Sequence, residues 1–298
     1  MIKNKKYARS DRKFAIVNYT LLTLVFLSVV YPLYYILISS ISEPNAVFSG
    51  QTLLRPVGIT LEGYKRVFSE PMIVRGFLNS VLYTAVGTLV SVSLIITTAY
   101  PLSKKILPGR KFIMVFYVIT MYFSGGLIPT FLVVSQLGMI NSMWALILPG
   151  GVAVFNVIVT RVFFETSIPE SLYDAAEIDG CSHLQTFFKI VIPLSKPIIA
   201  VMVIFTMVAY WNDWFTALIY LPSRDMAPLQ LVLRNILIEN QATANMMGGM
   251  SGGFAAANRI TELIRFASIV VASVPMLIAY PFVQKYFSKG MFLGAVKG

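Results

Sequence analysis

The sequence predicts an all-α integral membrane protein with six transmembrane helices and one long polar loop, residues 165–195, between the fourth and fifth helices. Three observations support this fold class. The 298-residue chain is 57% hydrophobic and only 12% charged, whereas soluble domains contain about 25% charged residues. Its mean hydropathy is +0.74. Long uncharged runs alternate with short basic segments, a pattern typical of membrane proteins whose basic loops face the cytosol.

The formal charge of +11 does not indicate a nucleic-acid partner. Most of the basic residues lie in short segments beside apolar runs rather than on one surface, and this distribution indicates membrane orientation instead. Cys181 is the single cysteine, which excludes an internal disulfide framework and a four-cysteine zinc site. We therefore expect neither a metal site nor nucleic-acid binding.

The first thirteen residues carry six lysines and arginines against one acid, Asp11. No charged residue follows between Phe14 and Ser42, and this run is far longer than the roughly 7–15 apolar residues of a secretory signal. The segment 1–13 is therefore expected to be a cytosolic basic N-terminus that precedes a retained first span.

Charges and helix breakers predict the remaining spans. The charge-free run at 112–160 is too long for one helix, and glycine, proline and asparagine residues divide it into two. A glycine-rich run at 248–253 is expected in a mobile outer loop. All spans lie in one transmembrane domain, 14–288, followed by a cytosolic tail, 289–298. The six predicted spans are 14–40, 77–102, 112–128, 144–164, 197–220 and 266–284.

The polar loop begins with a predicted short helix. Ser167 and Glu170 have the spacing of a capping box, with Pro169 in the first turn. Gly180 can adopt the left-handed conformation that ends the helix. Small side chains on one face would let another protein approach closely. At spacings of three and four, this face contains Leu172, Ala175 and Ala176.

A second short helix is predicted at 184–191. Ser182 precedes it as the expected N-cap, and Pro193 and Pro197 are expected to end it. The loop is therefore expected to consist of two helices joined by a tight turn at Gly180.

The spacing within this loop resembles the EAA loop of ABC importer permeases. Three residues separate Asp174-Ala175-Ala176 from Gly180, and nine residues separate Gly180 from Ile190-Val191-Ile192-Pro193. Asp174 and Ile192 stand where the family has Glu and Leu. The resemblance implies that this cytosolic loop couples the chain to a separate ATPase. The coupling residues that it implies are Leu172, Asp174, Ala175, Ala176, Gly180, Ile190 and Pro193.

Further stretches resemble a carbohydrate-uptake subgroup. Trp211-Asn212-Asp213-Trp214-Phe215 is similar to an aromatic-Asn-Asp motif in the fifth span of maltose-type permeases. The tail at 289–298 resembles the end of the shorter permease of that type. The stretches at 29–44 and 195–199 resemble its oligosaccharide branch, which includes lipoprotein-annotated systems. The implied function is a membrane-spanning subunit of an ATP-driven, binding-protein-dependent oligosaccharide importer in the bacterial plasma membrane.

The resemblance also implies partners. They are a second homologous permease, a cytosolic ABC ATPase dimer and an extracytoplasmic sugar-binding protein, in contact with membrane lipid. The dipeptide Gly-Lys does not occur in the sequence, which excludes a phosphate-binding loop of the Walker type. The chain is therefore expected to be a non-catalytic subunit without a cofactor, with ATP and Mg bound by the partner ATPase.

The fifth span holds the candidate substrate-pathway residues, each with an alternative role. Asp213 is the one charged residue within the run at 197–223; it can bond a sugar hydroxyl or cap a broken helix. Tyr210, Trp211 and Trp214, with Asn212 between them, can bind sugar rings or form an interfacial aromatic belt. His183, the single histidine, is expected at the surface.

Two other classes of function stay open at this point. A secondary transporter or channel would work alone, and the scarcity of acidic and histidine residues within the spans argues against proton coupling. A membrane-embedded enzyme would need paired carboxylates or a nucleophile and base at depth, which the sequence does not show.

Overall fold

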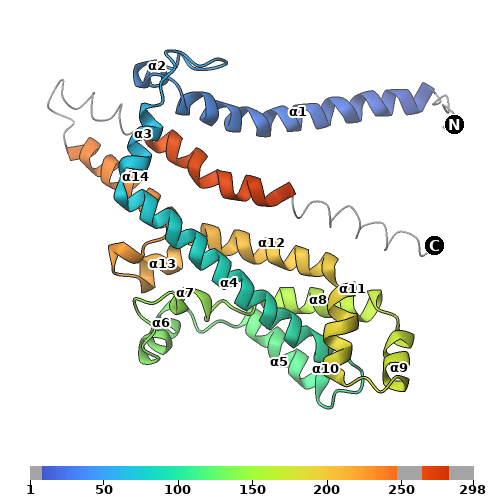
Figure 1. Cartoon of the computed structure of the whole chain (residues 1–298). Coiled ribbons are helices and arrows are strands. Elements are labelled where there is room, and N and C mark those ends of the chain that lie inside the picture. Colours follow the sequence, from blue (N-terminus) through green and yellow to red (C-terminus); the bar gives the residue numbers. More distant parts are fainter. Residues whose placement is uncertain (1–8, 247–263, 282–298) are drawn as a thin grey trace. The chain divides into compact units, whose positions relative to one another are not determined.

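The computed structural model describes residues 9–246 and 264–281, and these residues form helices and no strand (Figure 1). The chain divides into two units, Met1–Ser69 with Leu237–Val271 and Glu70–Ile236 with Ala272–Gly298. The predicted all-helical class is confirmed. The expected glycine-rich loop and the cytosolic tail lie outside the described residues.

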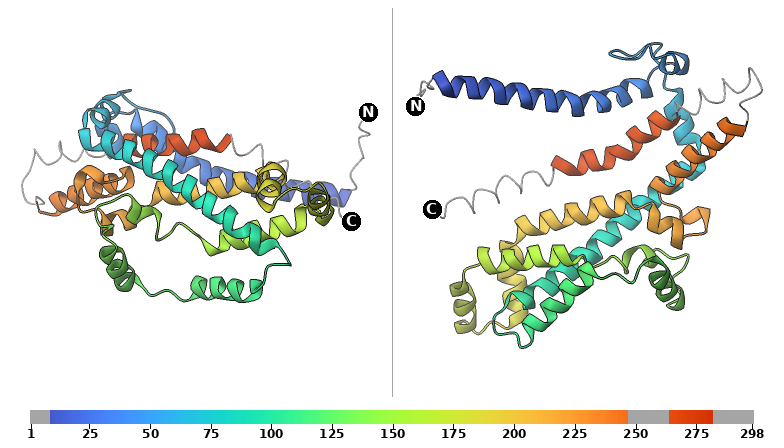
Figure 2. Two further views of the ribbon diagram at one scale, coloured as in Figure 1. Left: turned by 60° about the horizontal axis from the view of Figure 1, so that its bottom comes forward. Right: turned by 180° about the vertical axis from the view of Figure 1, so that it is seen from behind.

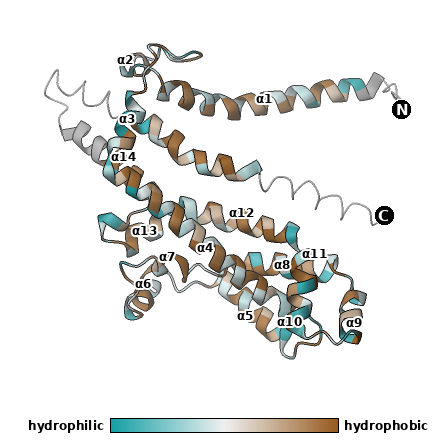
Figure 3. Ribbon diagram, in the orientation of Figure 1, coloured by the Kyte–Doolittle hydropathy of each residue, from teal (hydrophilic) through white to brown (hydrophobic). Residues whose placement is uncertain are grey.

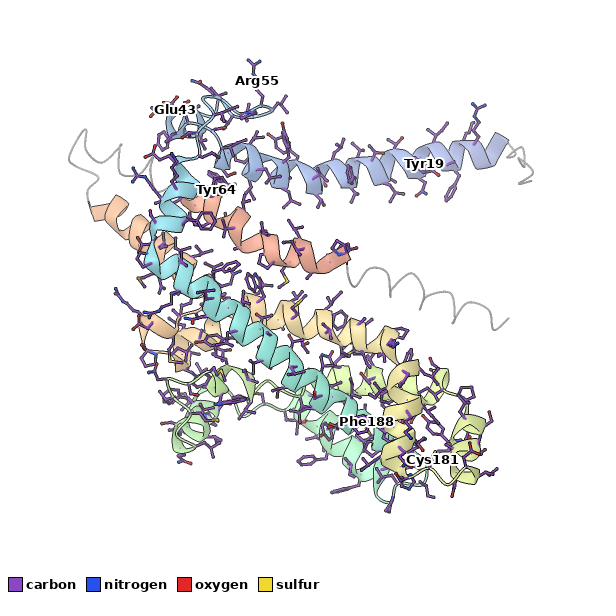
Figure 4. All side chains as sticks on the ribbon, viewed as in Figure 1. Tyr19, Glu43, Arg55, Tyr64, Cys181 and Phe188 are labelled. Atoms are coloured by element: carbon purple, nitrogen blue, oxygen red, sulfur yellow. The ribbon has the colours of Figure 1, made fainter. Side chains whose placement is uncertain are left out.

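The first unit is built around α1 (Arg9–Ser40), an apolar helix with Pro32 in its interior (Figure 3). Only 6% of its most apolar stretch is buried, as expected for a helix surrounded by lipid. Its end is fixed by polar contacts: the hydroxyls of Ser40 and Tyr64 lie 2.8 Å apart, and Tyr34 donates to the carbonyl of Leu54 at 2.7 Å. Figure 4 labels Tyr64 on α3 (Glu62–Ser69), which follows α2 (Pro44–Phe48).

The second unit has α4 (Pro71–Ser103) at its centre, packed against α8 (Val154–Ser167) and α12 (Lys196–Asn212). A stripe of small residues on α4 allows these helices to approach closely, as is common between membrane helices. At Gly87 a β-carbon would lie 2.9 Å from the ring of Tyr210. The buried small residues of this stripe are Gly76, Ser80, Thr84, Gly87, Thr88 and Ser91.

Several predicted continuous helices are broken in the structure. In place of one helix at 112–128, α5 (Arg110–Tyr122) ends before a 113° bend, and α6 (Leu127–Gln136) follows (Figure 2). In place of one helix at 144–164, α7 (Trp144–Ile147) and α8 are separate. Proline and glycine explain these breaks, since Ser124-Gly-Gly precedes α6 and Pro149-Gly-Gly lies between α7 and α8.

The fifth predicted span is also divided. Helix α12 ends at Asn212, and α13 (Phe215–Tyr220) follows after two residues. The remaining helices are η2 (Arg224–Met226), α14 (Leu229–Met246) and a last described helix, Ile264–Pro281.

Length and composition make three described helices suitable for crossing a membrane, and five when each of two sharply bent helix pairs is taken as one crossing. The three are Arg12–Ser40, Pro71–Ser103 and Ile264–Pro281. The count of six spans therefore stays a prediction.

Candidate functional site

The central loop, residues 165–195, begins with α9 (Glu170–Ile178). The predicted capping box at Ser167 is wrong: Ser167 is the last residue of α8, and Pro169 occupies the N-cap of α9 without a side-chain hydrogen bond. Because α8 continues through Ser167, its backbone is helical and cannot serve as the extended cap of a second helix. Glu170 instead accepts from Lys105 Nζ at 3.3 Å.

The turn after α9 follows the prediction. Gly180 has φ +73°, a conformation that costs a residue with a β-carbon about 1–2 kcal/mol. Ser182 then caps α10 (His183–Thr186), and its hydroxyl accepts from the backbone N–H of Gln185 while the Gln185 side chain accepts in return. His183 is exposed, as expected.

The second helix of the loop is longer than predicted. A π-helical turn, Phe187–Val191, continues α10 into α11 (Ile192–Leu194), so Pro193 lies within the helical segment rather than at its end. A 78° bend then leads into α12.

The predicted docking face is only partly exposed. Leu172 and Ala175 are exposed, and so is Asp174, but Ala176 is 3% exposed and is buried within the unit. The expectation that Ala176 lies on the free surface is therefore wrong for the chain on its own. Pro193 is exposed and Ile190 is half-buried.

The loop packs firmly onto the helices that cross the unit. Phe187 and Val191 belong to one hydrophobic core with Ile95 of α4 and Met202 of α12. Figure 4 shows Phe188, the neighbour of Phe187, on this helical segment, and its side chain is 64% exposed. The loop therefore presents one side to the core of the unit and the other to its surroundings.

An aromatic and charged cluster also joins α9 to the end of α4. Lys104 Nζ lies over the ring of Tyr173 and 5.3 Å from the ring centre of Tyr100, an arrangement in which the ring faces attract the cation. Burial lowers the pKa of Lys104 from 10.5 to about 8, although the carboxylates of Glu170 and Asp174 oppose this shift. Burial raises the pKa of Tyr173 to about 12, and Tyr100 adds to the shift.

A separate cavity of about 530 Å³, lined by polar and apolar side chains, lies at the other end of α12. Hydroxyls, an amide and one carboxylate face it together with aromatic rings, and Asp213 is the one charged residue among its described lining residues. Such a mixture suits a ligand with both hydroxyl groups and apolar ring faces. The polar lining residues are Ser91, Ser124, Thr130, Asn156, Thr206, Tyr210, Asp213, Thr216 and Tyr220.

Tyr210 and Asp213 are the two predicted pathway residues that line the cavity. The Tyr210 hydroxyl lies 2.7 Å from that of Ser91 and donates to the carbonyl of Ile147 at 3.2 Å. Asp213 Oδ1 accepts from the backbone N–H of Thr216 at 3.0 Å, so this carboxylate caps the first turn of α13. Within the described residues no hydrogen bond is made by the other carboxylate oxygen, which can therefore accept one from a ligand.

The other predicted pathway residues do not line the cavity. Trp211 is buried and donates from Nε1 to the carbonyl of Ala272 at 3.0 Å. Asn212 donates to the carbonyl of Val208, and Trp214 stacks against the guanidinium of Arg234 at 4.7 Å.

Sequence reasoning missed the contributions of α4 and α8 to this cavity. Ser91 and Asn156 are polar residues in apolar helices, and both are buried. A buried asparagine in a membrane helix is a signal that could have drawn attention to α8. The pairing of Ser91 with Tyr210 depends on the packing of α4 against α12, which the sequence does not specify.

Two relatives match almost the whole length of the chain. It is 43% identical over 288 residues to the polygalacturonan/rhamnogalacturonan transport system permease protein YtcP of Bacillus subtilis (strain 168), covering 97% of this chain and 99% of the relative. It is 39% identical over 292 residues to Protein LplC of the same organism, covering 97% of each.

A solved structure resembles the fold. It is a crystal structure of a bacterial ABC transporter involved in the import of the acidic polysaccharide alginate, with a TM-score of 0.84 and 34% identity, covering 95% of this chain and all of the matched chain. The model of the binding-protein-dependent transport system inner membrane component matches residues 4–293. The helical unit, its packed central loop and these matches show that the chain belongs to the family of binding-protein-dependent transport system inner membrane components.

Proposed function

We propose that this chain is the membrane-spanning permease subunit of an ATP-driven oligosaccharide importer, and that it forms half of the translocation pathway. The names of its relatives support a carbohydrate cargo. The cavity supports the same cargo class, because its hydroxyls, amide and carboxylate can bond sugar hydroxyls while Tyr210 and Phe215 can cover the apolar face of a sugar ring.

The proposed partners are a second homologous permease, a cytosolic ABC ATPase dimer and an extracytoplasmic sugar-binding protein. The chain would hydrolyse no ATP itself. Six spans in the bacterial plasma membrane, with both termini in the cytosol, would place the central loop on the side of the ATPase.

One structural observation carries the coupling proposal. Helix α12 begins one residue after α11 of the central loop and ends at the cavity, where Tyr210 is in its last turn. A rotation of the loop would therefore move one wall of the cavity through a single 17-residue helix. The shared core of Phe187, Val191 and Met202 makes the loop and α12 move together.

Gly180 provides the test of this coupling. A β-carbon there meets no atom of the described residues within 4 Å, so we expect a substitution to act through the left-handed backbone. Gly180→Val should displace α9 and abolish sugar uptake with loss of ATPase binding or with uncoupled hydrolysis, while the permease pair still forms. Gly180→Asn is the matched control and should retain most activity, because asparagine tolerates this conformation.

The measurements are co-purification of the ATPase, ATP turnover and oligosaccharide uptake in proteoliposomes. Normal uptake and normal ATPase recovery in Gly180→Val would show that the loop is not the coupling element. Uptake by this chain without any ATPase would favour the alternative, a stand-alone transporter or channel.

A further inference from the structure

Helix α5 leaves one side without a partner within the described chain. None of its 13 residues is buried, and Phe112, Val115 and Phe116 are each more than half exposed. Apolar exposure alone is ordinary for a helix that contacts lipid. Two adjoining cavities along α5, however, differ in charge: four cations line one, and mainly apolar side chains line the other.

The first cavity, of about 790 Å³, lies at the start of α5. Four cations line it, Lys105, Arg110, Lys111 and Arg161, and its described lining contains no carboxylate. The first turn of α5 faces the same region without a side-chain cap, so its partial positive charge adds to that of the cations.

The second cavity is an apolar groove of about 500 Å³ that continues along α5. It shares Met114, Val115 and Arg161 with the first cavity, so the two are contiguous. Its other lining residues are Val118, Ile119, Tyr122, Phe123 and Ile158.

The cationic end has a fixed geometry. One carboxylate oxygen of Glu165 accepts from Arg110 and also from Arg161 Nε, the latter at 3.0 Å, and all three side chains are largely shielded from solvent. The pairing orients the two guanidinium groups. With Lys105 paired to Glu170, the four cations and their two carboxylates keep a net charge of two positive.

The length of α5 agrees with the thickness of one membrane leaflet. Thirteen helical residues extend about 20 Å, slightly more than half of the roughly 30 Å hydrocarbon core. A headgroup held near Arg110 and Lys111 would thus place its acyl chain along the groove toward Phe123. A basic pocket at a membrane surface beside an apolar groove is suited to an anionic lipid.

We propose that the groove between α5 and α8 is a binding site for one anionic glycerophospholipid. Its phosphate occupies the cationic cavity of Lys105, Arg110, Lys111 and Arg161, and one acyl chain occupies the apolar groove. The site is independent of the transported sugar, since it requires only that α5 crosses one leaflet.

The test uses the assembled transporter in mild detergent and phosphatidylglycerol or phosphatidylcholine as probes. Native mass spectrometry should show phosphatidylglycerol retained in preference to phosphatidylcholine, and phosphatidylglycerol should raise the thermal unfolding temperature. The double variant Lys105→Gln with Lys111→Gln should weaken phosphatidylglycerol retention by about tenfold or more, since each cation contributes about 1 kcal/mol near an anionic surface. Arg110 and Arg161 are left intact, so the Glu165 network persists.

A matched control and a second probe keep the outcome decisive. Lys189→Gln removes an exposed lysine that lines neither cavity and should leave retention unchanged.

A photoreactive benzoylphenylalanine at Val118 should form an adduct of phospholipid mass. A protein-sized adduct would show that the second permease fills the groove, and equal retention of the two lipids would show no headgroup selectivity; either result overturns the proposal. Sugar uptake measured in parallel separates these outcomes from a failure of the transport function.

Discussion

At Gly87, the backbone of α4 lies close against the side chain of Tyr210 on α12. A β-carbon there would lie 2.9 Å from two atoms of the Tyr210 ring and 3.0 Å from a third. The ring cannot move freely, because its hydroxyl is held by Ser91 and by the carbonyl of Ile147. The single hydrogen side chain of glycine is therefore required for Tyr210 to reach the cavity wall.

We predict that Gly87→Ala destabilises the protein by about 1–3 kcal/mol, the usual cost of overpacking a close contact. Gly150→Ala is the control, since a β-carbon at that position meets no atom within 4 Å in the part of the chain that the structure describes. Thermal unfolding of the purified complex measures the difference. Equal unfolding temperatures for the two variants would contradict the close approach of α4 and Tyr210.

Lys104 gives a prediction that depends on pH. Burial lowers its pKa from 10.5 to about 8, so the folded protein releases this proton before the unfolded chain does. Between pH 8 and 10.5 the unfolded state binds more protons, and the contribution of Lys104 to the free energy of unfolding therefore rises with pH. NMR of ¹³C-methylated lysines should show one resonance, absent in Lys104→Arg, that titrates near pH 8. Titration of every lysine near 10.5 would contradict the burial.

The carboxylates beside Lys104 allow an internal check. Glu170 and Asp174 both raise its pKa, so Glu170→Gln should lower the titration midpoint of Lys104 further. Lys189→Gln, at an exposed site elsewhere in the loop, should not change it.

Local geometry explains which residues of the loop were predictable. Gly180 and Ser182 act on backbone groups within three residues, so their roles follow from the sequence alone. The prediction that Ser167 caps a helix was wrong because α8 extends through this residue. The backbone becomes extended only at Ile168, the residue before Pro169. The burial of Ala176 depends on how α9 packs within the unit, and no local pattern encodes that.

At the scale of elements, the break between α12 and α13 is held by one carboxylate. Asp213 caps α13 through Thr216 and also faces the cavity, so the two roles weighed from the sequence are compatible. Loss of a cap of this kind costs about 0.5–2 kcal/mol.

Two substitutions separate the roles of Asp213. Asp213→Asn keeps an oxygen acceptor for the Thr216 N–H, so complex assembly and basal ATPase activity should stay near normal, while uptake should fall if the carboxylate bonds sugar. Asp213→Ala should lower the thermal stability as well. Assembly and uptake would be measured together, and normal uptake in Asp213→Asn would leave capping as the sole role of this residue.

Long-range hydrogen bonds fix the connection between α6 and α7 to the segment at the end of α13. The backbone N–H of Asn141 donates to the carbonyl of Tyr220 at 2.8 Å, and the Asn141 side chain accepts from the backbone of Ser223 at 3.3 Å. These bonds join segments about 80 residues apart and satisfy groups that a continuous helix would satisfy internally. Apolar composition gives the positions of the helical segments but not their interruptions.

At the scale of the whole molecule, the basic segments predict the orientation. Ile106 follows Lys104 and Lys105 at the end of α4 and is 87% exposed, while Arg224 is exposed in the segment before α14. In a Cys181→Ser background, a membrane-impermeant thiol reagent added to intact cells should label Arg224→Cys and not Ile106→Cys. The reverse labelling would overturn the orientation derived from the lysines and arginines.

The fold class could be predicted from the composition of the whole chain, and the family from the residue spacing within the central loop. The all-helical architecture and the Gly180 turn were expected, and the structure shows both in the described residues. Tyr210 and Asp213 were expected in a substrate pathway; they line the cavity, and their role in transport stays a prediction. The cavity itself was not expected, since its described walls come from α4, α6, α7, α8, α12 and α13 together. Trp211 shows the limit most clearly: its motif placed it in the pathway, but packing turned it toward Ala272.

The small-residue stripe of α4 has a practical consequence for handling the protein. Helices in lipid associate through close fit rather than through the hydrophobic effect, so a harsh detergent can separate α4 from its neighbours without unwinding any of them. A far-ultraviolet circular dichroism spectrum would then look native in a preparation that has lost its cavity. Trp211, enclosed by Phe77 and Ala272, is the better reporter, because its fluorescence shifts to longer wavelength once water or detergent reaches the indole.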